Sequence, residues 1–142
     1  MPSPFERSFP DTGLPVGGRT EGITLRRLRE TLGPLVLHLE CAPQGEGGQV
    51  GRQVLQGLHE PVPVQRDGLL VLAGAPTDRD GVLGAIRQAG AGGYRAVVMK
   101  AYGCDLAPCV SAAEDAGVAL LTVPDDVPWR HFDALVTAAV GA

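Results

Sequence analysis

The sequence has little that would mark a membrane protein, a nucleic-acid-binding protein or a disulfide-stabilised protein. It contains no run of about 18 apolar residues, so it predicts no transmembrane helix. Its net charge is −4 without a basic stripe, which argues against binding to a phosphate backbone. Three cysteines, Cys41, Cys104 and Cys109, occur at no zinc-like spacing and predict reduced thiols in a cytoplasmic protein.

Motifs for cofactors and catalysis are also missing. Neither GxGxxG nor GxxxxGKS/T occurs, so the sequence offers no nucleotide-cofactor fingerprint. A metal site would require one of the three histidines to converge with a cysteine, and nothing in their spacing indicates that. Ser111 falls in the middle of a predicted helix, a poor place for an activated nucleophile. We therefore expect no catalytic residues, no metal and no cofactor.

Length and composition predict one soluble α/β domain with a flexible N-terminal arm. A chain of 142 residues can bury one real core but not two. Residues 1–22 are rich in proline and glycine and show no apolar period, so we expect an extended or disordered arm there, without the features of a signal peptide. We expect the folded domain over residues 23–142.

The stretch from Arg95 to Pro124 predicts a strand, a helix and a second strand. Residues 96–99 and 118–123 are nearly continuous apolar runs, which is typical of parallel strands buried on both faces. Asp105 can cap the intervening helix, which we expect to end at Gly117. A crossover of this length between parallel strands is almost always right-handed.

The rest of the folded part continues the same alternation of strands and helices. Strand 68–74, a helix capped by Thr77 or Asp78, and a last helix that begins at Pro128 complete a β-α-β-α-β-α order from Gly68 onward. This order predicts a mostly parallel sheet covered by helices. Earlier segments extend or cap it: a helix that starts after Thr24, a strand over 35–39, and a segment at 53–60 that could be a strand or a short helix and is better read as a strand.

Ligands of open α/β sheets bind beyond the carboxyl ends of the strands. Polar side chains and turn residues gather after the three predicted core strands, and these are the candidate ligand-binding residues: Gly74, Thr77, Lys100, Tyr102, Asp125 and Asp126. The simpler alternative is that Thr77 and Asp126 only cap helices and that Lys100 is a solvated residue at the end of a strand. Cys104 and Cys109 flank the start of a predicted helix, whose dipole could lower the pKa of one thiol, although ordinary free thiols are the simpler explanation.

The order of these segments resembles the N-terminal domain of PucR-like (purine catabolism regulator) transcription factors. The segments that carry the resemblance are 68–74, 96–100, 106–108, 117–124 and 127–129. In addition, Thr24-Leu25-Arg26-Arg27-Leu28 is similar to the TLRDLL entry of that domain, and 54–60 to one of its strands. This chain departs from the family at Leu70, Leu72 and Ala73, where the family has an acidic residue and two threonines.

The resemblance implies a sensory or regulatory α/β domain that lacks its own DNA-binding helix-turn-helix. It implies a homodimer, because such regulators bind paired half-sites. The candidate interface is the apolar stripe of the last helix, formed by Trp129, Phe132, Leu135 and Val136; packing of this stripe in the core is the alternative. Two other functions remain open: a small enzyme that acts on a polar metabolite through Lys100 or Asp125, and an interaction module without a ligand.

Overall fold

A five-stranded sheet lies at the centre of the chain. The computed structural model describes residues 23–57, 60–73 and 79–141, so the predicted arm of residues 1–22 lies outside the described residues. The strands lie side by side in the order β3-β8-β7-β6-β5. Neighbours from β5 to β8 are parallel, and β3 pairs with β8 antiparallel. Their bounds are β3 His38–Cys41, β5 Gln53–Gln56, β6 Leu69–Leu72, β7 Ala96–Met99 and β8 Ala119–Thr122.

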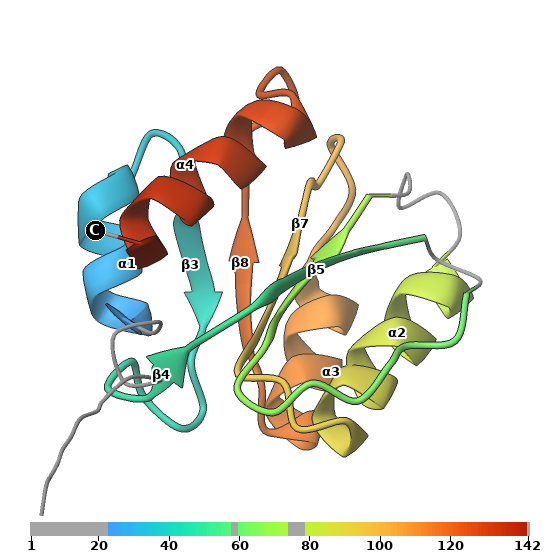
Figure 1. The fold of residues 1–142 in the computed structure, drawn as a ribbon. Coiled ribbons are helices and arrows are strands. Elements are labelled where there is room, and N and C mark those ends of the chain that lie inside the picture. The colour runs from blue at the N-terminus through green and yellow to red at the C-terminus, as the bar shows by residue number, and fades with distance from the viewer. Residues whose placement is uncertain (1–22, 58–59, 74–78, 142) are drawn as a thin grey trace, which may run out of the picture.

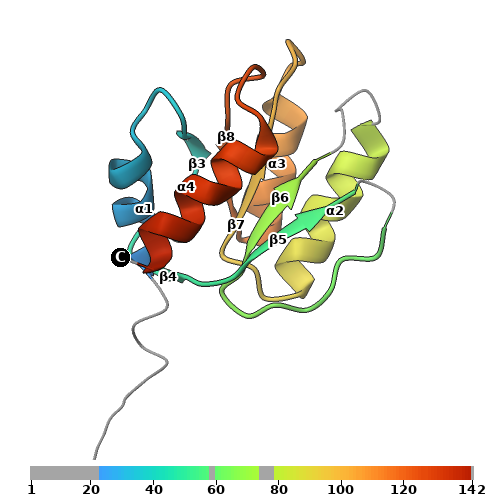
Figure 2. The same cartoon turned by 45° about the horizontal axis from the view of Figure 1, so that its top comes forward.

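Helices cover both faces of this sheet (Figures 1 and 2). Their bounds are α1 Leu25–Leu32, α2 Arg79–Ala91, α3 Ala107–Ala116 and α4 Trp129–Gly141. Helices α1 and α4 enclose one core cluster with one set of strand side chains, and α2 and α3 enclose a second cluster with the other set. The predicted α/β class and mostly parallel sheet are therefore confirmed.

The central strands form because their side chains are apolar on both faces. All four residues of β6 and of β7 are buried, and so are three of the four in β8. Alternation divides them between the clusters: Val98 packs toward α1 and α4, and Val97 toward α2 and α3. Strands of this kind can exist only between two helical layers, which is the arrangement that the continuous apolar runs predict.

Helix ends follow the local signals in the sequence. Thr24 Oγ1 accepts a hydrogen bond from the Arg27 backbone N–H at 3.1 Å and so caps α1. Asp105 Oδ1 accepts one from the Ala107 N–H at 3.0 Å at the start of α3. Gly117 ends α3 at φ 77°, a left-handed conformation that glycine adopts without steric cost. Pro128 lies one residue before α4, and its carbonyl accepts from His131 and Phe132.

The predicted strand over 35–39 is displaced. Residues 34–36 form a turn, in which the Gly33 carbonyl accepts hydrogen bonds from the N–H groups of Val36 and Leu37. Leu35 is 87% exposed at this turn, whereas Leu37 is buried. The strand begins at His38 because its pairing with β8 starts at the register His38–Thr122.

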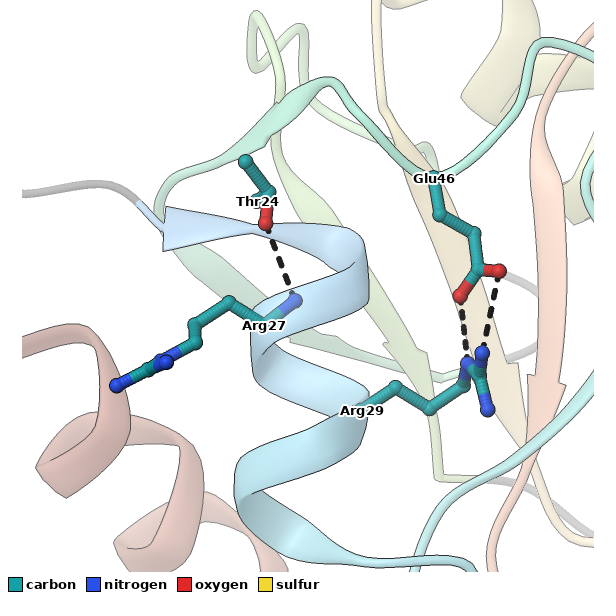
Figure 3. A network of polar contacts seen from close by, with 4 residues as sticks. All are labelled: Thr24, Arg27, Arg29 and Glu46. Atoms are coloured by element: carbon teal, nitrogen blue, oxygen red, sulfur yellow. Dashed lines mark hydrogen bonds and ion pairs between the residues drawn. The ribbon is translucent and has the colours of Figure 1, made fainter.

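A small antiparallel pair and an ion pair anchor α1. Strand β2 (Ile23–Thr24) pairs with β4 (Gln49–Val50), which follows the loop over residues 42–48. Arg29 points from α1 to Glu46 in that loop, and the two make a two-pronged contact, Nε–Oε1 2.6 Å and Nη2–Oε2 3.1 Å (Figure 3). Arg26 and Arg27 of the same helix are exposed, whereas Arg29 is half-buried in this contact.

The ion pair with Arg29 predicts how stability depends on pH. The hydrogen bonds from Arg29 hold the pKa of Glu46 below its ordinary value. A lowered carboxyl pKa contributes stability above the unfolded-state pKa, about 4.3, and loses it as pH falls through the lower folded-state pKa. Glu46→Gln should lower the free energy of unfolding at pH 7 by about 1 kcal/mol, and urea titrations should show this difference begin to shrink as pH falls below about 4. Glu30→Gln, at an exposed position of α1, is the control and should change little at either pH.

Two glycines of α2 should respond in opposite directions to alanine. A Cβ at Gly90 would lie 2.7 Å from the Ala116 carbonyl oxygen of α3, so the two helices must separate to admit it. Gly90→Ala should therefore destabilise the protein by about 1–3 kcal/mol. A Cβ at Gly84 meets nothing within 4 Å, and Gly84→Ala should stabilise it by about 0.5–1 kcal/mol through helix propensity. If Gly90→Ala and Gly84→Ala changed the midpoint of thermal unfolding equally, the close approach of α2 and α3 would be contradicted.

Candidate functional site

The loops that follow β7 and β8 meet at the carboxyl edge of the sheet. The Tyr102 backbone N–H donates a hydrogen bond to Asp125 Oδ1 at 3.0 Å, which joins the two loops. The sequence predicted that Lys100, Tyr102 and Asp125 would gather at this edge, and the structure places them there. Asp126 is exposed, and no hydrogen bond joins it to another described residue. Gly74 and Thr77 lie outside the described residues.

Lys100 is a buried charge at this edge. It follows β7 directly and, by alternation with Ala96 and Val98, lies on the face that α1 and α4 cover. Only 5% of its surface is exposed, so the alternative expectation of a solvated lysine is wrong. Its Nζ lies 4.6 Å from the centroid of the Trp129 ring, which provides a cation–π contact. Among the described residues, none lies within ion-pair or hydrogen-bond distance of this ammonium group.

Trp129 brings a second unpartnered donor to the same place. It is the first residue of α4, and its ring meets that of Phe132 edge-on, with centroids 5.8 Å apart and planes at 77°. Its indole Nε1 is buried without a hydrogen-bond partner in the described part of the chain. Buried polar groups nearly always have partners, so this N–H can donate to an acceptor from outside the described residues.

Tyr102 has a strained backbone. Its φ of 50° lies in the left-handed region, which costs a residue with a Cβ about 1–2 kcal/mol. Its side chain is 44% exposed, so core packing does not explain why an aromatic residue stands at this position. Non-glycine residues in such conformations concentrate at functional sites. The sequence named Tyr102 for its place in the chain, but the strain could not be foreseen from it.

The cysteines do not form a reactive pair in this structure. Cys104 is exposed and Cys109 is buried, and both line a cavity of about 40 Å³ beside Met99 and Leu106. Burial raises the pKa of the Cys109 thiol, which is opposite to the lowering that a helix dipole would produce. Burial likewise raises the pKa of Cys41. The expectation of ordinary thiols fits these surroundings better than that of a redox sensor.

The apolar stripe of α4 is used mainly within the chain. Phe132 and Val136 are at most 1% exposed and belong to the core cluster beneath α1 and α4. The prediction that these two residues belong to a dimer interface is wrong, because their side chains are already buried in the core. Leu135 and Trp129 are half-buried and keep surface that a partner could cover.

Two further observations concern metals and membranes. Across residues 23–57, 60–73 and 79–141, no group of three or more histidine, cysteine or acidic side chains is placed to hold a metal ion. Over the same residues, no helix has the length and apolar character needed to cross a membrane.

Comparisons with known proteins identify no family. No protein-family model, no curated protein and no solved structure matches the chain. The site is therefore defined by its own geometry: a buried lysine beneath the first residue of α4, beside two loops that one hydrogen bond joins. The protein class that this geometry defines is an α/β domain with a candidate binding site at the carboxyl edge of a parallel sheet.

Proposed function

We propose that this chain is the sensory domain of a PucR-like regulator and binds a small polar effector at the carboxyl edge of its sheet. The observation that carries the proposal is Lys100, whose ammonium group is held beneath Trp129 without a counter-ion among the described residues. Burying a charge without a partner costs stability, so an effector that supplied a counter-charge would stabilise this edge. The lack of a basic stripe agrees with a domain that does not itself bind DNA.

The surroundings of Lys100 favour binding over catalysis. Asp125 is engaged by the Tyr102 backbone N–H, and the Trp129 ring covers one side of the lysine. No hydrogen bond or ion pair joins Nζ to a described acid or base, so the described residues form no nucleophile–base pair with Lys100. Tyr102, strained and exposed beside this site, offers an aromatic surface to a ligand.

We also propose a cytoplasmic homodimer that forms through the outer surface of α4. Support comes from Leu135 and Trp129, whose half-buried side chains lie on a helix otherwise committed to the core. An aromatic or aliphatic anchor of this kind, surrounded by polar residues, is the usual centre of an interface.

A thermal-shift screen with purine-degradation metabolites tests the sensory role. A ligand that binds only the folded state raises the midpoint of unfolding in proportion to RT ln(1 + [L]/Kd), about 2.7 kcal/mol at 100 times Kd. We expect at least one metabolite to stabilise the wild type and to lose most of that effect in Tyr102→Gly, which keeps the backbone conformation and removes the ring. Arg87→Gln, exposed on α2, should keep the full effect. No shift with any metabolite, together with a stable dimer, would instead favour an interaction module.

Substitution on the outer surface of α4 tests the dimer. Leu135→Glu should convert a dimer to a monomer in sedimentation velocity while the circular dichroism spectrum stays unchanged, because a charge cannot be buried unpaired in an interface. Ser111→Glu places the same charge on α3, on the opposite face of the sheet, and should leave the dimer intact. A wild-type chain that sediments as a monomer, or a Leu135→Glu dimer, would contradict the proposed interface.

A further inference from the structure

The proposed effector site has a consistent electrostatic character. Helix α4, 13 residues long, begins directly above Lys100 with Trp129, and its dipole places positive potential at that end. Its first turn contains no acidic residue and carries Arg130 and His131, both exposed. Cations at the N-terminal end of a helix are unfavourable, and the buried Lys100 adds further positive charge beside this end.

Unpartnered hydrogen-bond donors converge at the same place. The N–H groups of His131 and Phe132 bond to the Pro128 carbonyl, but those of Trp129 and Arg130 have no acceptor among the described residues. Within the described ranges, the Lys100 ammonium and the indole Nε1 of Trp129 have no acceptor either. These groups are all donors, and two of them belong to side chains in contact with each other.

Lys100 is buried but not completely enclosed, because 5% of its surface is exposed. In the described part of the chain, the fully enclosed side-chain polar atom without a partner is Trp129 Nε1. A ligand would approach Nζ through the exposed part of the lysine. The nearby carboxylates do not neutralise it, since Asp125 and Asp126 make no ion pair with Lys100, Arg130 or His131.

We infer that this edge binds an oxyanion, the carboxylate or phosphate group of the effector, with Lys100 as its charged anchor. The inference deepens the proposed sensory function and rests on it. One oxygen of the anion accepts from Lys100 Nζ, and a second accepts from the free N–H groups at the start of α4. The anion supplies the lysine with a counter-charge that no described residue provides, and the Trp129 ring lies against Nζ.

The chain provides its own reporter, because Trp129 is the only tryptophan. In a ¹⁵N–¹H spectrum of the labelled protein, one indole signal comes from the residue that touches Lys100. We expect inorganic phosphate and acetate, each titrated against sodium chloride at constant ionic strength, to shift this signal and the Trp129 and Arg130 amide signals along saturable curves. The anion that binds with the lower Kd identifies the charged group of the effector as phosphate or carboxylate.

Variants separate a built site from general attraction to positive charge. Lys100→Gln should weaken the fitted Kd about 10- to 100-fold, the worth of a hydrogen bond to a charged group. Lys100→Arg should restore most of the affinity, which keeps the test decisive where Lys100→Gln fails to fold. Arg27→Gln removes the same charge from an exposed position of α1 and should change Kd less than about twofold.

The outcomes distinguish this inference from the function on which it rests. Linear shifts without saturation, or an unchanged Kd in Lys100→Gln, would overturn the oxyanion site. An uncharged metabolite that raises the unfolding midpoint and leaves the indole signal unmoved would overturn it too, while the sensory role would stand. Failure of both the anions and the metabolites to bind would overturn both.

Discussion

Two-sided burial of the central strands is the constraint on which the rest of the structure depends. Strands β6, β7 and β8 have apolar side chains on both faces, so the sheet needs a helical layer on each side. Parallel strands then require crossover helices. Each of these helices starts at the edge where the preceding strand ends and runs back to the opposite edge, where the next strand begins. The carboxyl ends of the strands and the N-termini of the helices therefore share one edge, where positive helix ends face any ligand.

Local chemistry made much of this fold predictable. Apolar runs identified the three core strands, Thr24 marked the start of α1 and Gly117 the end of α3. Each signal acts within a few residues: a side chain accepts from an N–H two or three positions on, or a glycine takes a left-handed conformation. The parallel order followed from the spacing between strands, which is too long for hairpins and suits a crossover helix.

Features that depend on distant contacts were not predictable. The run Leu35-Val36-Leu37 has the composition of a strand, yet hydrogen bonds to the Gly33 carbonyl hold it in a turn. The strand begins only at His38, where pairing with β8 starts. The sequence left open whether Lys100 binds a ligand or is solvated, although alternation with Ala96 and Val98 already placed it on a covered face. The alternation could not predict that Trp129, the first residue of α4, would lie against the Lys100 ammonium group.

The antiparallel edge strand has a consequence for how the protein is made. Among the described strands, β3 pairs with β8 alone, so residues 38–41 find that place in the sheet after residues 119–122 have been synthesised. Helix α1 depends on the same late event, because its buried leucines share a core with α4. At a synthesis rate of about 5–20 residues per second, this N-terminal segment spends several seconds on the ribosome without its partner. The last third of the chain thus completes the first, and a release of the chain before β8 would leave β3 without this partner and α1 without α4.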